Sequence, residues 1–232
     1  MNKVSALIFG CNSSTNEIVK NIQSKYKEIV VFKHKTEPRN LELERSDVEI
    51  FDFGDTWEFL EDIYDLKNSI VFCVLEDDAE NIFLTISLRA TFKELNIIAL
   101  SKNKESANKL TMAGANKVIP MVQTTAAIIS DILEKPIVTE VLHNILYEKS
   151  DLKIAQVEID NEDYFEGKYP ADIEWGRKYG VTLLSIINDD MSSEFIYSSR
   201  AKHHAIRNGD IFVVVGYERD INEFKQLIGK DI

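Results

Sequence analysis

Six short runs of β-branched and other apolar residues recur through the first 133 residues of the chain, at positions 4–9, 29–32, 48–51, 70–75, 97–100 and 117–119. Most neighbouring runs are separated by a segment whose apolar residues recur at helical spacing. Apolar strands that alternate with crossover helices are typical of a parallel sheet with both faces covered, because each parallel connection has to return along the sheet. The pattern therefore predicts an α/β fold with a doubly wound parallel sheet.

Acidic residues mark the expected starts of two of these helices. Asp55 stands two residues before Trp57 and three before Glu58, and Asp77 and Asp78 follow the fourth apolar run. An aspartate at the start of a helix accepts hydrogen bonds from backbone N–H groups that have no partner within the helix. We therefore expect Asp55 to cap one helix and the Asp77–Asp78 pair to open the next.

The alternation of apolar runs and helical segments ends at Glu134-Lys135-Pro136. Proline disfavours a continuing helix and is well placed in the first turn of a new one, so we expect a new helix to begin there. The helix expected after it carries an apolar stripe along one face, made of Ile137, Val138, Val141, Leu142, Ile145 and Leu146. Two interpretations are equally favoured: the stripe packs on its own chain, or it docks a second subunit.

After a polar joint at residues 147–151 the chain becomes rich in strand patterns, at 155–159, 181–188, 195–198 and 211–216. Turn residues stand at 188–190 and 208–210, and helices are expected at 172–179, ending at Gly180, and at 220–228. The sequence thus predicts three parts: a domain over 1–135, a connecting or dimerisation helix with its linker over 136–150, and a small α+β domain over 151–232.

The chain has a net charge of −12, which argues against a nucleic-acid partner and against adsorption to an anionic membrane surface. Its longest apolar runs fall far short of the ~20 residues that a membrane-spanning helix needs. The first apolar run is interpreted as a strand and not as a signal peptide, since no small-residue cleavage site follows it. Cys11 and Cys73 adjoin apolar runs without metal-ligand spacing, so we expect buried free thiols in a reducing cytoplasm.

The segment from Leu7 to Ile22 joins a strand to a helix in the place of a dinucleotide-binding turn, whose fingerprint is Gly-x-Gly-x-x-Gly. Gly10 occupies the first glycine position, but Asn12 and Thr15 replace the second and third, where glycine lets the pyrophosphate and the helix approach. Ser13, Ser14 and Thr15 place hydroxyl and N–H groups at the start of the helix. These groups could bind an anion, and they are also the residue types typical of ordinary helix capping.

Lys33 follows the second strand, where a dinucleotide site usually has an acid for the ribose hydroxyls. Because lysine accepts no hydrogen bond, NAD is the poorest candidate, whereas an adenine nucleotide or an NADP-like ligand remains compatible. Loss or weakening of the site is favoured over its retention.

The order of several short motifs resembles the RCK (regulator of potassium conductance) family, with its TrkA-N and TrkA-C domains. The resemblance covers nearly the whole chain and rests on the turn at Gly10 and on Phe53-Gly54-Asp55-Thr56, Asp77-Asp78-Ala79-Glu80-Asn81, Ala113-Gly114-Ala115-Asn116-Lys117-Val118-Ile119-Pro120, Phe165-Glu166-Gly167-Lys168, Tyr179-Gly180-Val181-Thr182-Leu183-Leu184, Arg207-Asn208-Gly209-Asp210 and Val213-Val214-Val215-Gly216. It implies a Rossmann-like ligand-sensing lobe that dimerises or forms a larger ring, and a potassium-conducting membrane subunit as partner. It also implies a cytoplasmic location, peripheral to the inner membrane through that partner. The family contains lobes that have lost their ligand.

Clustered carboxylates offer a further candidate site, because Glu76, Asp77, Asp78 and Glu80 crowd the end of the fourth strand and Asp52 and Asp55 follow the third. Asp55 is therefore counted with the candidate binding residues at this rim. Such clusters suit Ca²⁺, which takes six to eight oxygen ligands. Helix capping at a solvated edge is favoured, since no calcium-loop motif accompanies the cluster.

His203 and His204 are adjacent and are expected to face opposite ways on an extended segment, so no metal site is predicted. The sequence also has no nucleophile elbow and no phosphate-loop lysine motif. The leading hypothesis is a non-enzymatic gating subunit or domain for potassium transport. The alternatives are an NAD(P)-dependent oxidoreductase, and a structural lobe that binds no ligand.

Overall fold

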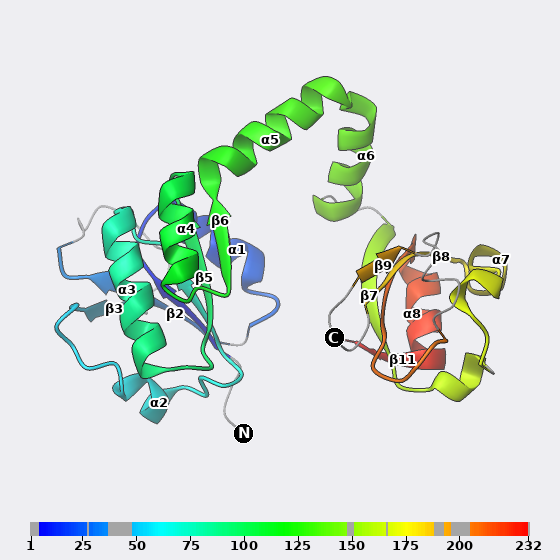
Figure 1. Cartoon of the computed structure of the whole chain (residues 1–232), viewed down its shortest axis with the longest axis horizontal. Helices are drawn as coiled ribbons and strands as arrows, with labels where there is room; N and C mark the ends of the chain where they lie inside the picture. The colour runs from blue at the N-terminus through cyan, green and yellow to red at the C-terminus, as the bar shows by residue number, and fades with distance from the viewer. Residues whose placement is uncertain are drawn as a thin grey trace. The chain divides into compact units, whose positions relative to one another are not determined.

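The computed structural model describes residues 5–26, 28–36, 48–147, 151–165, 167–187, 193–195 and 205–231 (Figure 1). The chain divides into two compact units, Met1–Ser130 and Asp131–Ile232. Each unit has its own hydrophobic core.

The first unit is built on a sheet of six parallel strands in the order β3-β2-β1-β4-β5-β6. Its elements are β1 (Ser5–Phe9), α1 (Ser13–Ile22), β2 (Glu28–His34), β3 (Val48–Phe51), α2 (Phe59–Ile63), β4 (Ile70–Cys73), α3 (Asp78–Thr91), β5 (Asn96–Ser101), α4 (Lys104–Met112), β6 (Lys117–Pro120) and α5 (Met121–Glu134). The strand order reverses direction between β1 and β4. In open α/β sheets this reversal is where the crevice for a ligand forms.

The two faces of this sheet are covered by different helices because successive side chains of a strand point to opposite sides. Leu7 and Phe9 of β1 pack with Leu84 and Leu88 of α3, and Figure 1 shows α3 beside α4. Ala6 and Ile8 instead pack with Val19 of α1 on the opposite face. A doubly wound sheet results.

The second unit contains α6 (Pro136–Tyr147) and an antiparallel sheet in the order β11-β7-β10-β8-β9. The strands are β7 (Leu152–Ile159), β8 (Val181–Ile187), β9 (Ser193–Phe195), β10 (Ile211–Tyr217) and β11 (Gly229–Asp231). Two short 3₁₀ helices, η1 (Glu162–Phe165) and η2 (Pro170–Asp172), accompany α7 (Trp175–Tyr179) and α8 (Glu218–Ile228). The core beneath the sheet is aromatic, with Trp175 packed edge-on against Phe212 and Phe224.

These elements confirm the predicted fold class, a Rossmann-like doubly wound sheet followed by a small α+β region. The cap expected at Asp77 is present, since its carboxylate accepts the N–H groups of Ala79 and Glu80 at 2.8 and 3.0 Å. Gly180 ends α7 in the left-handed region, with φ 67°. A Cβ there would lie 2.8 Å from a carboxylate oxygen of Asp220, so glycine is required.

Two local predictions were wrong. Asp55 does not cap a helix, because α2 begins at Phe59 and the Asp55 carboxylate instead accepts the N–H of Asp52 at 2.8 Å. This short-range bond closes a turn and competes with helix formation. The helix expected over 172–179 is two separate pieces, η2 and α7. The turn at 188–190, the histidines at 203–204 and the joint at 148–150 lie outside the described residues.

Candidate functional site

A cavity of about 350 Å³ opens at the carboxyl ends of the parallel strands, where the strand order reverses. It is bounded by the start of α1, the ends of β4 and β5 and the start of α5. Its walls consist of Asn12, Ser13, Ser14, Val74, Leu75, Glu76, Asp78, Leu100, Ser101, Lys102, Met121 and Val122. We call this cavity the switch-point cavity. It occupies the usual position of a ligand in this type of sheet.

Gly10 shapes one side of the cavity because it brings the β1–α1 turn against the end of β4. Its φ is +126°, and a Cβ at this position would lie 2.8 Å from the carbonyl carbon and oxygen of Val74. Its N–H donates to the carbonyl of Phe32 at 2.8 Å. Only glycine satisfies this close approach without strain.

Asn12 is buried and joins the same turn to β4. Its Oδ1 accepts the N–H groups of Ser14 and Thr15 at 3.0 and 3.3 Å, and its Nδ2 donates to the Val74 carbonyl at 2.6 Å. The Thr15 hydroxyl accepts the N–H of Asn12 at 3.3 Å and donates to the Gly10 carbonyl at 2.7 Å. The N–H groups of Ser14 and Thr15, which a phosphate at the helix start would bind, therefore already have an acceptor within the chain.

Lys33 and Asp55 are not among the residues that line the cavity. Lys33 lies on β2 opposite Ile50 of β3, one strand further from the strand reversal than β1. Asp55 belongs to the turn at Asp52, whose carboxylate forms an ion pair with Lys35. The structure thus brings Asn12, Ser13 and Ser14 to the cavity, whereas Gly10 and Thr15 support the turn.

Two members of the acidic cluster at the end of β4, Asp77 and Asp78, form hydrogen bonds within the chain. Asp77 caps α3, and Asp78 accepts the Lys102 N–H at 3.2 Å and the Asn103 side-chain amide at 3.1 Å. Within the described residues, no group of three or more His, Cys, Asp or Glu is arranged to hold a metal ion. This geometry is that of helix caps at an exposed edge.

Sequence reasoning missed two buried polar residues beside the cavity. Asn81 of α3 accepts the Leu75 N–H at 3.0 Å and donates to the carbonyls of Cys73 and Leu100 at 3.0 and 2.9 Å, so it joins the ends of β4 and β5. Ser101, which ends β5, is 1% exposed, and its hydroxyl has no hydrogen-bond partner among the described residues. A polar residue at the end of an apolar strand was the available signal.

Cys11 and Cys73 are both buried, and neither takes part in a disulfide among the described residues. Burial raises the pKa of the Cys73 thiol to about 12, so it stays protonated at neutral pH. A protonated, buried thiol is a packing group and a poor nucleophile.

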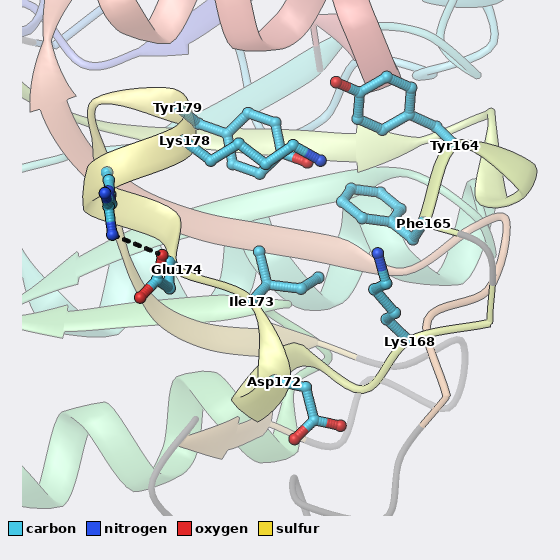
Figure 2. Close-up of a pocket in the computed structure, with 9 residues that line it drawn as sticks. Tyr164, Phe165, Lys168, Asp172, Ile173, Glu174, Lys178 and Tyr179 are labelled. Atoms are coloured by element: carbon cyan, nitrogen blue, oxygen red, sulfur yellow. Dashed lines mark ion pairs between the residues drawn. The ribbon is translucent and has the colours of Figure 1, made fainter.

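The second unit has a cavity of its own, of about 480 Å³, formed by η1, η2 and α7 and shown in Figure 2. Tyr164 and Tyr179 form one wall, and the Lys178 ammonium lies 5.3 and 4.9 Å from their ring centres. Burial raises the pKa of Tyr179. The Arg177 guanidinium lies 3.7 Å from Glu174, as the dashed line in Figure 2 marks. The first and second units thus each contain a cavity with polar and apolar walls.

The helices α5 and α6 expose apolar side chains to an unusual degree. Ile137, Val138, Val141, Leu142 and Leu146 of α6 are 46–76% exposed. On α5 the exposed apolar residues are Met121, Val122, Ile128, Ile129, Ile132 and Leu133. A contiguous apolar surface that is exposed to solvent is typical of an interaction site. The described residues of the second unit leave most of the α6 stripe exposed.

Comparison with known proteins places these features in context. A family model for the TrkA-N domain matches residues 6–120. The chain is similar to Potassium channel protein 1 of Methanocaldococcus jannaschii, with 23% identity over 155 residues that make up 67% of this chain and 45% of the relative. It is also similar to Probable potassium channel protein 2 of the same organism, with 25% identity over 162 residues, 67% of this chain and 46% of the relative. The chain therefore spans about half the length of these curated relatives.

Among solved structures, the human SLO3 gating ring aligns with 94% of this chain and 45% of that chain, with a TM-score of 0.66 and 12% sequence identity. At this identity the likeness concerns the fold. No helix in the described part of the chain combines the length and the apolar character that a membrane span requires.

Proposed function

We propose, from the match of residues 6–120 to the TrkA-N domain family model, that this chain is a cytoplasmic regulatory domain of a potassium channel or transporter. It acts by a change of shape and carries out no catalysis. The observation that carries the proposal is the alignment of 67% of the chain with a protein named as a potassium channel. The fold of the human SLO3 gating ring, which aligns with this chain at a TM-score of 0.66, is compatible with the proposal.

The physical basis of such regulation is linkage between a ligand and two shapes of an assembly. A ligand shifts the equilibrium only by the difference between its affinities for the two shapes. The switch-point cavity is a candidate for the ligand, and its walls come from α1, β4, β5 and α5. A ligand there contacts the start of α5, so its binding free energy can depend on where α5 lies.

The proposal includes a homodimer or larger ring, assembled through the apolar stripe of α6. Ile137 is 76% exposed and Val138, Val141 and Leu146 are at least half exposed, which is unfavourable for a helix that stays in water. An assembly that covers the stripe on two copies removes this surface from solvent. Ring formation in turn lets many copies act together on one pore.

The switch-point cavity favours a regulatory lobe over an oxidoreductase. In a dinucleotide-dependent enzyme the pyrophosphate binds the first N–H groups of the helix, and here Asn12 binds those of Ser14 and Thr15. The expected ribose-binding acid is replaced by Lys33.

Affinity purification of the tagged protein from detergent-solubilised membranes of its source organism tests the proposal. The expected result is co-purification of a potassium-transporting membrane protein, identified by mass spectrometry, at near-stoichiometric amounts. Val141→Asp on α6 serves as the variant that prevents assembly, and Glu140→Gln on the same helix as its control. Recovery of no cation-transport protein with the wild-type chain would count against the proposed function.

A further inference from the structure

We infer that the cavity formed by η1, η2 and α7 binds a small organic anion, an aromatic ring that carries one carboxylate. We call this cavity, which has a volume of about 480 Å³ and lies within the second unit, the η1–α7 cavity. It shares no lining residue with the switch-point cavity. The inference therefore goes beyond the proposed function and does not depend on it.

One side of the η1–α7 cavity is an aromatic surface. Phe165 and Tyr179 are buried, and the ring centre of Tyr164 lies 5.5 and 6.2 Å from theirs. Figure 2 shows the Ile173 side chain on the opposite side of the cavity from Tyr179. Rings and an aliphatic side chain on two sides of a cavity suit a flat apolar ligand group.

Hydrogen bonds hold together the elements that carry these side chains. Trp175 of α7 donates its indole N–H to the Pro170 carbonyl of η2 at 2.8 Å, and the Lys168 N–H donates to the Phe165 carbonyl of η1 at 2.9 Å. Trp175 also belongs to the core of the second unit. Because these walls are already ordered, a ligand does not have to order them on binding, and this lowers the free-energy cost of binding.

Two ammonium groups are placed to meet a carboxylate at this aromatic surface. Lys178 Nζ lies 5.3 and 4.9 Å from the ring centres of Tyr164 and Tyr179, where cation–π attraction favours it. Figure 2 shows the Lys168 side chain pointing towards Phe165. An anion between the two lysines gains charge-assisted hydrogen bonds while its apolar part stays against the rings.

The charges of the walls favour a single negative charge on the ligand. The Arg177 guanidinium lies 3.7 Å from Glu174, so these two charges offset one another, and Figure 2 shows the Asp172 carboxylate pointing away from the rings. Three cations and two carboxylates leave the lining with a charge of +1, in a chain whose net charge is −12. A monocarboxylate matches this charge, whereas a doubly charged phosphate monoester brings excess negative charge close to Asp172 and Glu174.

Isothermal titration calorimetry of the full chain with a matched set of probes tests the inference. The probes are phenylacetate, its neutral analogue 2-phenylethanol, acetate and phenyl phosphate. We expect phenylacetate to bind more tightly than each of the others, because it alone combines the ring with a single negative charge. Higher salt should weaken its binding, since counterions screen the charges of exposed lysines.

Lysine variants test the two ammonium groups. Lys168→Met and Lys178→Met should each weaken phenylacetate binding about fivefold, the effect of losing a partly exposed ion pair. Lys178→Arg keeps the charge over the rings and should retain most of the affinity. Lys153→Met on β7 is the matched control, because it removes a lysine of the same unit that does not line the cavity, and it should leave the affinity unchanged. The side chains of Lys168 and Lys178 are exposed, and circular dichroism confirms that each variant is folded.

Three results would overturn the inference: no heat of binding with phenylacetate, equal or tighter binding of any other probe by the wild type, or unchanged phenylacetate affinity in both Lys168→Met and Lys178→Met. Tighter binding of phenyl phosphate would assign a phosphorylated ligand to the cavity instead. The proposed function is judged separately, by recovery of a potassium transporter with the wild-type chain.

Discussion

Replacement of Leu142 by aspartate is expected to dissociate the proposed dimer while each protomer stays folded. Leu142 is 46% exposed in the single chain and lies in the α6 stripe. Covering that fraction of a leucine side chain removes about 80 Å² from water, which contributes about 2 kcal/mol at ~25 cal/mol per Å². In a twofold interface the change is present on both copies, so the loss is about 4 kcal/mol, or about a thousandfold in Kd. Desolvation of the new carboxylate adds to it.

Sedimentation velocity over a range of protein concentrations measures this effect. The wild type and the Glu140→Gln control are expected to sediment as dimers or larger assemblies at concentrations where Leu142→Asp is a monomer. Circular dichroism and thermal melting should be similar for all three proteins, because the substituted side chain is already half exposed in the protomer. A wild type that is monomeric throughout, or a Leu142→Asp protein with unchanged association, would refute the reasoning.

Three further predictions concern stability. Gly10→Ala should lower the free energy of unfolding by about 3 kcal/mol in urea titrations, because φ is +126° and the new Cβ would lie 2.8 Å from the Val74 backbone. Gly54→Ala is the control and should have little effect, since the nearest atom to its new Cβ is 3.9 Å away. Equal losses of stability in the two variants would contradict this reasoning. Arg89→Met should lower the free energy of unfolding by about 3 kcal/mol, since the guanidinium donates to the carbonyls of Phe92 after α3, Leu95 before β5 and Gly114 after α4. A loss below ~1 kcal/mol would be contrary to this account. The free energy of unfolding should fall as the pH rises from about 9 towards 12, because burial raises the pKa of the Cys73 thiol from 9.0 to about 12 and the unfolded chain therefore releases the proton first. Cys73→Ala should reduce the dependence of the free energy of unfolding on pH in this range. An unchanged dependence would exclude Cys73 as its source.

The doubly wound sheet could be predicted from the sequence because its signal is repeated and local. Each apolar run overlaps a strand of the observed sheet, although the bounds differ: β2, at Glu28–His34, is longer than its run, whereas β4 ends at Cys73, two residues before the end of its run. A sheet buried on both faces requires nearly continuous apolar strands, and few other structures produce that pattern. The α6 stripe was equally visible, but its exposure depends on the rest of the chain.

The details of the site depended on contacts between residues distant in sequence. Asn12 could be interpreted either as part of an anion site or as a cap. The deciding bond runs to the carbonyl of Val74, 62 positions away. Asn81 has no local signature and Ser101 has only its place at the end of an apolar strand, because the approach of β4 and β5 gives both residues their surroundings. The error at Asp55 had a local cause, because a turn and a helix cap use the same carboxylate in the same way.

Rubidium-tracer uptake by cells of the source organism, with and without the gene for this chain, tests the central claim most directly. If the chain regulates a potassium pathway, its removal should change the rate of uptake, and a plasmid that carries the wild-type gene should restore it. Restoration should fail with Leu142→Asp, whose protomer is folded but does not assemble. Identical uptake in the presence and absence of the chain, over a range of external potassium concentrations, would contradict the account.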